Sequence, residues 1–524
     1  MGSLMGVARH QHLNQALMRI TRRAESTDRY TLATTYVGAG SFSAVLNSTD
    51  HQILYGRRGT GKTHALLYLS DLIESAGDVF IYVDLRTIGS AGGIYADSAL
   101  SPAVRGTHLL VDTLEAIHED LLTIAIEREV ADQDRLLHAL ADLVDAATAV
   151  EVVGEVERET TLSGATETNR GLQLSMTPRP TASASASRKR SVTAENRIRR
   201  TGIERHHVLF GRLNRALRAV TESLRPARLW LLLDEWSSIP LDLQPLLADL
   251  LRRGVLPVTG ITVKIAAIER RSRFFVPTVT AGDYLGIEVG ADAASAVSLD
   301  DFMIFDHTRH RAEEFFGRLF FNHTSAKLAA MIRNPPSDPQ ALITETFRGN
   351  AFAELVRAAE GIPRDAINIA ALAAQHANDD PIGIAEVRRA ARDWYLRDKQ
   401  TAINTNEPAR RMLQLLVDEV VGRRRSRTFV IDQSAGTHHD DIDMLYDARL
   451  LHVLRRGIVD RQSPGKVYDG FSVDYGCYVA LLLDRNSHAR LLRDRTGWLS
   501  SPKSVPTEDF SLTRAEIDLS ALGC

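Results

Sequence analysis

Mainly apolar runs separated by helical patterns recur between residues 50 and 310. The runs cover residues 53–55, 78–85, 229–233, 261–268 and 300–306. An apolar run without polar alternation, such as 229–233, is typical of a strand that is covered on both faces. Strands that alternate with helices favour a doubly wound α/β fold. We therefore predict an α/β protein with a five-stranded parallel sheet.

The first run leads into a glycine-rich turn and then into an apolar helical stretch. The segment reads HQILYGRRGTGKTHALLYL, and its spacing Gly56-x4-Gly61-Lys62-Thr63 is the phosphate-binding P-loop pattern. Glycines permit positive φ, so that backbone N–H groups can wrap a phosphate, and the helix N-terminus adds partial positive charge. Lys62 would bridge the β- and γ-phosphates of ATP, and the Thr63 hydroxyl would bind Mg²⁺.

The run at 229–233 ends in two carboxylates, in the segment RLWLLLDEWSSIP. Open α/β sheets bind ligands at the carboxyl ends of their strands. Asp234 would hold Mg²⁺ through water, and Glu235 would act as the general base toward the attacking water. The alternative is that Asp234 or Ser237 caps the next helix, predicted over 241–253. The predicted nucleotide-binding residues are Gly56, Arg57, Arg58, Gly59, Thr60, Gly61, Lys62, Thr63, His64 and Asp234.

Composition narrows the class of protein without naming a partner. A chain of 524 residues predicts two to four domains, and 44% hydrophobic with 25% charged residues is typical of a soluble globular protein. The net charge of -3 indicates no general affinity for polyanions. Two cysteines, Cys477 and Cys524, exclude a disulfide framework and favour a reducing cytoplasm. We expect no signal peptide, no membrane span and no metal site at the histidine pairs 206–207 and 438–439.

A long insertion separates the second and third strands. About 140 residues lie between 85 and 229, whereas a crossover unit needs only about thirty. We predict helices over 108–144, a polar hairpin within 151–177, low complexity around PRPTASASASRKR, and a helix over 207–224. A basic cluster with Arg188, Lys189 and Arg190 could contact nucleic-acid phosphates, or it could be a solvated linker.

Beyond the sheet, residues 351–377 predict two helices interrupted at Gly361 and Pro363. Arg364 lies in the first turn of the second helix, where the helix dipole disfavours a cation. A specific role for Arg364 is one interpretation, and a solvated arginine is the other. The C-terminal region predicts a helix at 412–421, a strand at 427–433, a helix at 440–456, and a hairpin at 457–476 that turns at Pro464 and Gly465.

The charges of this C-terminal region point in two directions. Basic residues that could meet DNA are Arg423, Arg424, Arg425, Arg427 and Lys466. The helix that would approach a groove carries four aspartates, namely Asp440, Asp441, Asp443 and Asp447. Carboxylates facing phosphates are repulsive, although acidic residues also suit a helix start. The region could therefore bind protein, or it could touch DNA only through its hairpin and arginines.

The segments GRRGTGKT, LLLDEW and GIPRDAIN, in this order and followed by the C-terminal region, resemble the AAA+ ATPases of the initiator (origin-recognition-like) clade, bacterial-type, with a winged-helix-like module. The resemblance covers residues 36–483. It implies a five-stranded P-loop core, a helical lid, a nucleotide at their junction, and Arg364 as the lid's sensor arginine toward the γ-phosphate. The family's small polar residue at the end of the fourth strand is replaced here by Glu269. Its arginine finger has several candidates: Arg252, Arg253, Arg270, Arg271 and Arg273.

We predict an N-terminal segment (1–35), a P-loop core (36–330, with the insertion at 108–206), a helical lid (331–403), a winged-helix-like domain (404–485) and an extended tail (486–524). The expected function is that of an ATP- and Mg²⁺-dependent switch with slow ATP hydrolysis, associated with nucleic acid and assembled as a homo-oligomer. The catalytic set would be Lys62, Glu235 and Arg364. One alternative is a signalling or defence NTPase that acts on a protein partner. Another is a scaffold that binds nucleotide without turnover.

Overall fold

The computed structural model describes most of the chain. The described residues are 2–22, 24, 27–38, 42–88, 100–127, 132–147, 151–158, 198–205, 209–277, 284–292, 295–300, 309–424, 426–433, 440–459, 465–483 and 516–517. They form two compact units. Unit 1 comprises residues 1–75, 265–271 and 296–524, and unit 2 comprises residues 76–264 and 272–295.

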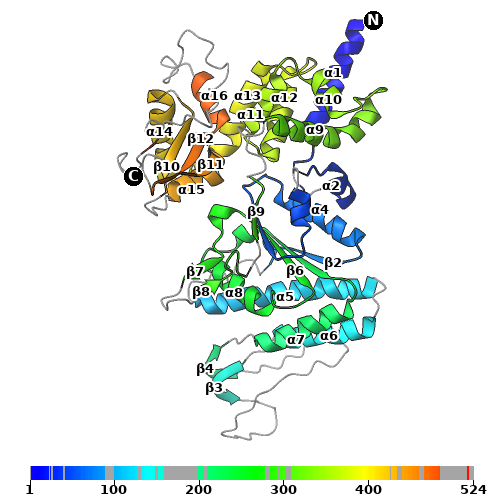
Figure 1. Ribbon diagram of the computed structural model, residues 1–524, viewed down its shortest axis with the longest axis vertical. Helices are drawn as coiled ribbons and strands as arrows, with labels where there is room; N and C mark the ends of the chain where they lie inside the picture. Colours follow the sequence, from blue (N-terminus) through cyan, green and yellow to red (C-terminus); the bar gives the residue numbers. More distant parts are fainter. Residues whose placement is uncertain are drawn as a thin grey trace. The chain divides into compact units, whose positions relative to one another are not determined.

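A five-stranded sheet underlies the α/β fold (Figure 1), with the strand order β2 (Val79–Asp84), β5 (Leu229–Asp234), β6 (Ile261–Ala267), β1 (Gln52–Tyr55), β9 (Ser295–Ser298). Every residue of β5 and β6 is buried, as expected for strands covered on both faces. Strands β2 and β5 are parallel, and Asp84 is the register partner of Asp234. The predicted fold class, an α/β protein with a five-stranded parallel sheet, is confirmed.

Four of the five strands lie where the apolar runs predict them, but the fifth does not. It is β9 at Ser295–Ser298, whereas the prediction was 300–306. Residue 300 lies in a turn, and residues 301–306 fall outside the described part of the chain. The described strand at this edge of the sheet has the sequence SAVS, and Leu299 N donates to Tyr55 O directly after it.

Unit 1 contains a layer of helices with its own core. Its members are α1 (Gly2–Met18), α9 (Arg309–Met331), α10 (Pro339–Thr346), α11 (Ala351–Ala359), α12 (Pro363–Ala377) and α13 (Ile384–Trp394). The predicted helix pair at 351–377 is confirmed as α11 and α12. The N-terminal helix α1 belongs to this layer, because Leu13, Ala16 and Leu17 are buried in the same core as α9, α11 and α12. The helices α2 (Arg29–Thr35), α3 (Phe42–Leu46) and α4 (Lys62–Ser75) complete the N-terminal part.

The C-terminal module of unit 1, residues 407–483 with 516–517, has a three-stranded sheet in the order β10-β12-β11. Its elements are α14 (Glu407–Leu416), a π-helical turn (Val417–Arg423), β10 (Thr428–Asp432), α15 (Asp440–Asp447), β11 (Leu451–Val459), β12 (Val467–Val473) and α16 (Tyr475–Leu483). Strands β11 and β12 form the predicted antiparallel hairpin. From the tail, Ile517 N donates to Val430 O, so this part of the tail extends along β10.

The predicted helix over 440–456 is wrong in its second half. The helix α15 ends at Asp447, and residues 451–456 belong to β11. Arg449 adopts a left-handed conformation with φ 60°, which stops the helix. Its guanidinium forms ion pairs with Asp365 and Asp398, so tertiary contacts support a conformation that a non-glycine residue rarely adopts.

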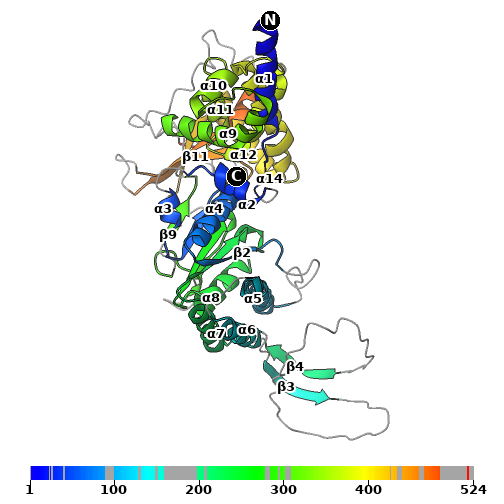
Figure 2. The ribbon, with the colours of Figure 1, turned by 90° about the vertical axis from the view of Figure 1, so that its right-hand side faces the viewer.

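Unit 2 carries the insertion as helices beside the sheet (Figures 1 and 2). Helix α5 (Pro102–Glu127) packs against α6 (Gln133–Ala147) and α8 (Gln244–Gly254), and α7 (Phe210–Ser223) packs against α6. The predicted helices in this region are therefore confirmed. Two short strands, β7 (Phe275–Pro277) and β8 (Tyr284–Gly286), pair with each other.

The hairpin predicted within 151–177 is wrong in its pairing. The strand β3 (Glu151–Arg158) is present, but its antiparallel partner is β4 (Ile198–Arg205), which lies beyond the predicted range 151–177. A sequence pattern identifies a strand without identifying its partner, and here the partner comes from the basic end of the insertion. Residues Arg188, Lys189 and Arg190 lie outside the described residues, as do the histidine pairs 206–207 and 438–439.

Across the described ranges, no helix combines the length and the apolar character that a membrane span requires. Within the same residues, no group of three or more histidine, cysteine or acidic side chains is arranged to hold a metal ion.

Candidate nucleotide-binding site

The loop between β1 and α4, residues 56–61, makes a tight turn. Gly59 and Gly61 have φ of 86° and 99°, which is the left-handed region that favours glycine. A Cβ on Gly56 would lie 2.5 Å from Thr60 Oγ1, so a side chain there would displace the loop. Thr60 Oγ1 donates to Arg57 O at 2.8 Å and closes the turn. The glycines that the motif requires are therefore the residues that this backbone path requires.

Lys62 is the first residue of α4 and is buried. Its Nζ donates to Gly56 O at 2.8 Å and to Arg57 O at 3.2 Å. The ammonium is thus held over the loop by neutral main-chain carbonyls. Because hydrogen bonds between charged groups are stronger than those to a neutral acceptor, phosphate oxygens could replace these carbonyls. Arg58 is exposed on the same loop, and Thr63 is half-buried beside Lys62.

His64, the next residue of α4, faces the N-terminal helices. Its Nε2 lies 2.8 Å from Leu32 O, and its ring makes edge contacts with Tyr36 and His323. Burial lowers the pKa of His64, so its ring is held neutral. Tyr36 in turn stacks on Tyr68 with ring centroids 4.0 Å apart. These contacts anchor the start of α4 to the segment that precedes β1.

Arg57 points into the interior of unit 1, which the sequence did not indicate. Its Nε donates to Asp300 Oδ1 at 2.9 Å, and its backbone N donates to Asp300 Oδ2 at 3.0 Å. Nη1 lies 2.6 Å from His452 Nδ1, and the guanidinium lies 5.1 Å from the Tyr446 ring centroid. Burial alone would raise the pKa of Asp300, but Arg57 outweighs it and keeps the pKa below its ordinary value. Arg57 therefore anchors the loop through its side chain.

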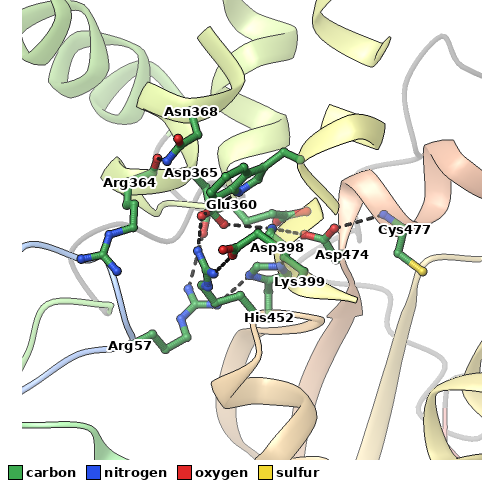
Figure 3. Close-up of polar contacts among 12 residues, drawn as sticks. Arg57, Glu360, Arg364, Asp365, Asn368, Asp398, Lys399, His452, Asp474 and Cys477 are labelled. Atoms are coloured by element: carbon green, nitrogen blue, oxygen red, sulfur yellow. Dashed lines mark hydrogen bonds and ion pairs between the residues drawn. The ribbon is translucent and has the colours of Figure 1, made fainter. Parts of the chain in front are cut away.

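Arg364 contacts the same loop from α12. Its backbone N donates to Gly59 O at 3.1 Å. A Cβ on Gly59 would lie only 2.6 Å from Arg364 Cβ, so glycine allows the first turn of α12 to approach the loop. Figure 3 shows the Arg364 guanidinium directed away from Asp365 and Lys399. The structure thus places Arg364 against the glycine-rich loop, and its contact with a γ-phosphate stays a prediction.

In unit 2, Asp234 ends β5 and is fully buried. Its Oδ2 accepts a hydrogen bond from Tyr82 Oη at 2.7 Å, and its Oδ1 accepts one from Glu235 N at 2.7 Å. Glu235 has φ 56°, a left-handed conformation that is uncommon outside glycine and occurs often at functional sites. The next helix, α8, is preceded by Leu243 with no side-chain cap. Neither Asp234 nor Ser237 caps it, so the capping alternative is wrong.

An arginine that the sequence analysis missed lies beside these carboxylates. Arg86 follows β2 and forms a two-pronged pair with Asp84, with Nε–Oδ1 at 3.0 Å and Nη2–Oδ2 at 2.6 Å. Its Nη1 lies 3.9 Å from Glu235 Oε1. Burial alone would raise the pKa of Asp84, but the hydrogen bonds from Arg86 lower it overall. An acidic residue followed closely by arginine at the end of an apolar strand was the available signal.

The end of the fourth strand, β6, is occupied by an ion pair. Glu269, the residue that stands where the family pattern has a small polar one, pairs with Arg456 of β11 through two bonds of 2.6 and 2.5 Å. Its two neighbours are also paired. Arg270 contacts Asp443, and Arg271 Nε lies 2.5 Å from Asp447 Oδ2, both on α15.

The remaining arginine-finger candidates lie in unit 2. Arg252 and Arg253 both pair with Asp249, at 2.6 and 2.8 Å. Arg252 also lies over the Tyr284 ring, 4.7 Å from its centroid. Arg273 is exposed, and its backbone N donates to the Gln244 side chain. Within the described part of the chain, the other four candidates are held in ion pairs and Arg273 is not, a distinction that the sequence could not make.

Basic residues of the C-terminal module have acidic partners within unit 1. Lys466, predicted at the hairpin tip, lies 3.2 Å from Glu516 Oε1 and 3.5 Å from Asp432 Oδ2. Arg427 contacts Glu360. Two further pairs are Arg423–Glu419 and Arg424–Glu419, and Arg425 lies outside the described residues. The basic residues considered for DNA contact therefore each have an acidic partner within unit 1, as far as the structure describes them.

Neither a protein-family model nor a curated protein matches the sequence. Among solved structures, the chain is similar to the Orc1 protein of Aeropyrum pernix, determined in complex with DNA. The two share 12% sequence identity over 89% of this chain and 98% of the other, with a TM-score of 0.27.

Proposed function

We propose that this protein binds ATP with Mg²⁺ and hydrolyses it slowly, as an AAA+ nucleotide-driven switch. The observation that carries the proposal is the glycine-rich loop. It joins a strand to a helix, places two glycines at positive φ, and holds the buried Lys62 ammonium on its own carbonyls. Positive φ and a helix start are what a phosphate cradle needs, and Lys62 adds a positive charge at this loop.

The acidic end of β5 supplies residues suited to Mg²⁺. A carboxylate has about four acceptor sites, and the two known donors to Asp234 leave capacity for further ligands. Thr63 and Asp234 are the residues that would hold the ion, since Mg²⁺ takes oxygen ligands. When bound, Mg²⁺ would neutralise charge developing on the phosphates. Glu235 is partly exposed and would accept the proton of the attacking water.

Calorimetric titration with Mg²⁺ and ATP tests the binding proposal. We expect the wild type to bind and Lys62→Ala to lose roughly 10- to 100-fold in affinity, since a charge-assisted hydrogen bond contributes about 1.5–3 kcal/mol. Lys327→Ala is the matched control, because its Nζ also donates to a main-chain carbonyl, that of Arg19, at 2.8 Å. Wild-type protein that takes up no nucleotide, or a Lys62→Ala variant that binds as well as the control, would refute the proposal.

We further propose that the switch acts on nucleic acid, through the basic segment of the insertion. The basic sequence of that segment supports the proposal. The basic residues of the C-terminal module are weaker candidates for DNA contact, because they already have acidic partners. Binding to duplex and single-stranded DNA should weaken steeply with salt and should fall when Arg188, Lys189 and Arg190 are replaced by glutamine. The matched control replaces the exposed α7 residues Arg212, Arg215 and Arg218, which removes the same charge. Equal loss in both variants would contradict a specific contact.

The alternative is a switch that acts on a protein partner. It is favoured by α15, whose Asp443 and Asp447 are bound to Arg270 and Arg271, so that the helix expected to enter a groove is engaged within unit 1. This alternative predicts that ATP turnover is unchanged by bare DNA.

The family resemblance also leads us to propose a homo-oligomer, in which a neighbouring copy would supply an arginine to the site. Sedimentation with and without ATP would test that assembly.

A further inference from the structure

Two residues of the glycine-rich loop are held at the two ends of one chain of buried contacts (Figure 3). At one end, Arg57 Nη1 lies 2.6 Å from His452 Nδ1 of β11. At the other end, Gly59 O accepts a hydrogen bond from the backbone of Arg364 on α12. The loop that would hold the phosphates is therefore connected to both the helical layer and the C-terminal module.

The contacts between these ends are continuous. His452 Nε2 lies 3.1 Å from Asp474 Oδ1, and Lys399 Nζ lies 2.5 Å from the same oxygen. Lys399 Nζ also forms an ion pair with Asp365 Oδ2, at 2.9 Å. The angles of this contact do not meet the criteria for a hydrogen bond. Asp365 is the residue next to Arg364. The path thus leaves the loop at Arg57 and returns to it at Gly59.

The members of this path are shielded from solvent. Arg57 is 5% exposed, His452 2%, Lys399 1%, and Asp365 and Asp474 0%. Burial alone would raise the pKa of Asp474, but Lys399 and His452 outweigh it and hold the pKa well below its ordinary value. The charged groups alternate in sign along the path, with the imidazole of His452 between Arg57 and Asp474, so each charge depends on its neighbours. A buried charge that loses its partner is strongly destabilised, which makes the arrangement all-or-none.

His452 links the two halves of the path in one protonation state. A guanidinium can only donate, so Nδ1 must accept from Arg57, and Nε2 must carry the proton that is donated to Asp474. The imidazole is then neutral. Burial lowers the pKa of His452, which agrees with that assignment. Displacing β11 would leave Arg57 with Asp300 as its main partner and would leave Asp474 short of a donor.

The position of Arg57 in the loop gives these contacts a consequence for the lysine. The carbonyl of Arg57 accepts hydrogen bonds from both Thr60 and Lys62. A shift of Arg57 therefore moves an acceptor of Lys62 and one of the bonds that close the turn. Preorganisation of such a loop improves affinity because less ordering remains to be done on binding.

We propose that the C-terminal module controls nucleotide affinity at the P-loop through the contact between His452 and Arg57. The module docked on the loop is the high-affinity state, and Arg57, His452 and Asp474 act as positioning residues. Because binding equilibria are reciprocal, nucleotide stabilises the docked module in turn. A partner that pulls on β11 or β12 would therefore promote nucleotide release. This proposal rests on the proposed ATP binding and concerns its regulation.

Titration with Mg²⁺ and ATP of wild type, His452→Ala, His452→Gln and His376→Ala tests it. Glutamine can accept from Arg57 and donate to Asp474, so it should retain affinity, while alanine should lose about 5- to 150-fold, the usual range for coupled sites. His376→Ala is the matched control, because His376 makes a similar contact of 3.0 Å with Asp393 away from the loop. Thermal unfolding confirms that each variant is folded.

The outcomes separate the two proposals. If the wild type binds no nucleotide, the proposed function fails first. If the wild type binds and a folded His452→Ala variant binds equally well or more tightly, the regulatory proposal is overturned while ATP binding stands. Equal losses in the alanine and glutamine variants, with the control unchanged, would also contradict it, since the bridging hydrogen bonds would then be irrelevant.

A second measurement does not depend on the histidine variants. Saturating ATP should slow amide hydrogen exchange in β11 and β12 of the wild type, because nucleotide stabilises docking. Arg57→Lys keeps the charge but lacks the fork that reaches Asp300 and His452 together, so ATP should slow these strands much less in this variant. Wild-type protein that binds ATP without a change in β11 and β12, or an identical response in Arg57→Lys, would overturn the proposal.

Discussion

The glycine-rich loop and the acidic end of β5 are the two halves of the predicted nucleotide site, and they are supported differently. The loop depends on partners far along the chain, since Arg57 contacts Asp300, 243 residues away, and His452, 395 residues away. Asp234 depends on the adjacent strand and its own neighbour, through Tyr82 and Glu235 N. One half is therefore open to regulation from the C-terminal module, while the other is determined by a single strand pair.

The largest expected effect concerns the acidic half. Replacing Glu235 by glutamine removes the proposed general base, and such a loss lowers the rate by about 10²- to 10⁴-fold. ATP affinity should change little, because the loop half is untouched. Phosphate release and ATP titration measure the two quantities on one sample. Glu288→Gln, at an exposed position in unit 2, is the control. An unchanged rate would show that Glu235 is not the base and would favour the scaffold alternative.

For the buried contacts that support the glycine-rich loop, we expect the main effect of a substitution to be on the free energy of unfolding. Asp474→Asn removes the charge that faces Lys399 and His452, and breaking a buried ion pair costs about 3–5 kcal/mol in the free energy of unfolding. Urea unfolding measures the loss. The control, Glu222→Gln, breaks an exposed pair with Arg135 and should cost no more than about 1 kcal/mol. If Asp474→Asn and Glu222→Gln lost equal free energies of unfolding, the buried ion pairs would contribute no more to stability than an exposed pair does.

Acid should also lower the free energy of unfolding through His323, whose ring contacts that of His64 beside the glycine-rich loop. Burial and, to a smaller extent, His64 lower the pKa of His323 to about 4. The unfolded chain, with a histidine pKa of about 6.5, then binds more protons than the folded chain between pH 4 and 6.5. Stability from this group is complete above pH 6.5 and declines as the pH falls through that window.

The size of this acid effect can be measured by urea unfolding at pH 7.5 and 4.5. His323 should account for roughly 2–3 kcal/mol of the wild-type loss, since one pKa unit corresponds to about 1.4 kcal/mol. His323→Gln carries no titrating group and should lose that much less. A variant whose stability falls as steeply as the wild type would show that His323 is charged or accessible in the folded protein.

The smallest effect is expected from Tyr82→Phe. It removes the donor to Asp234 Oδ2 and leaves the bond from Glu235 N, so the free energy of unfolding should fall by about 1–2 kcal/mol. Tyr30→Phe, at a side chain that is 79% exposed, is the control. If nucleotide affinity also changed strongly in Tyr82→Phe, the acidic half would be as dependent on its support as the loop half is.

Pattern reasoning located most elements but not their partners. The strands β1, β2, β5 and β6 are apolar enough to be recognised, whereas the short strand β9, with the sequence SAVS, is not. Periodicity identified β3, but its partner β4 lies across the insertion. The helix predicted over 440–456 ends at Asp447, because aspartates distant in the sequence hold Arg449 in a left-handed conformation. Each error arose where a long-range contact overrode a local preference.

The sequence by itself determined the strand–turn–helix around Lys62 and the carboxylates that follow an apolar strand. Both depend on spacing within a few residues, where backbone geometry leaves few choices. Only the tertiary structure decided where the charged side chains go, turning Arg57 toward His452 and pairing the aspartates of α15 with Arg270 and Arg271. Such pairings follow from burial, because a charge removed from water must find a partner wherever the fold brings one within reach.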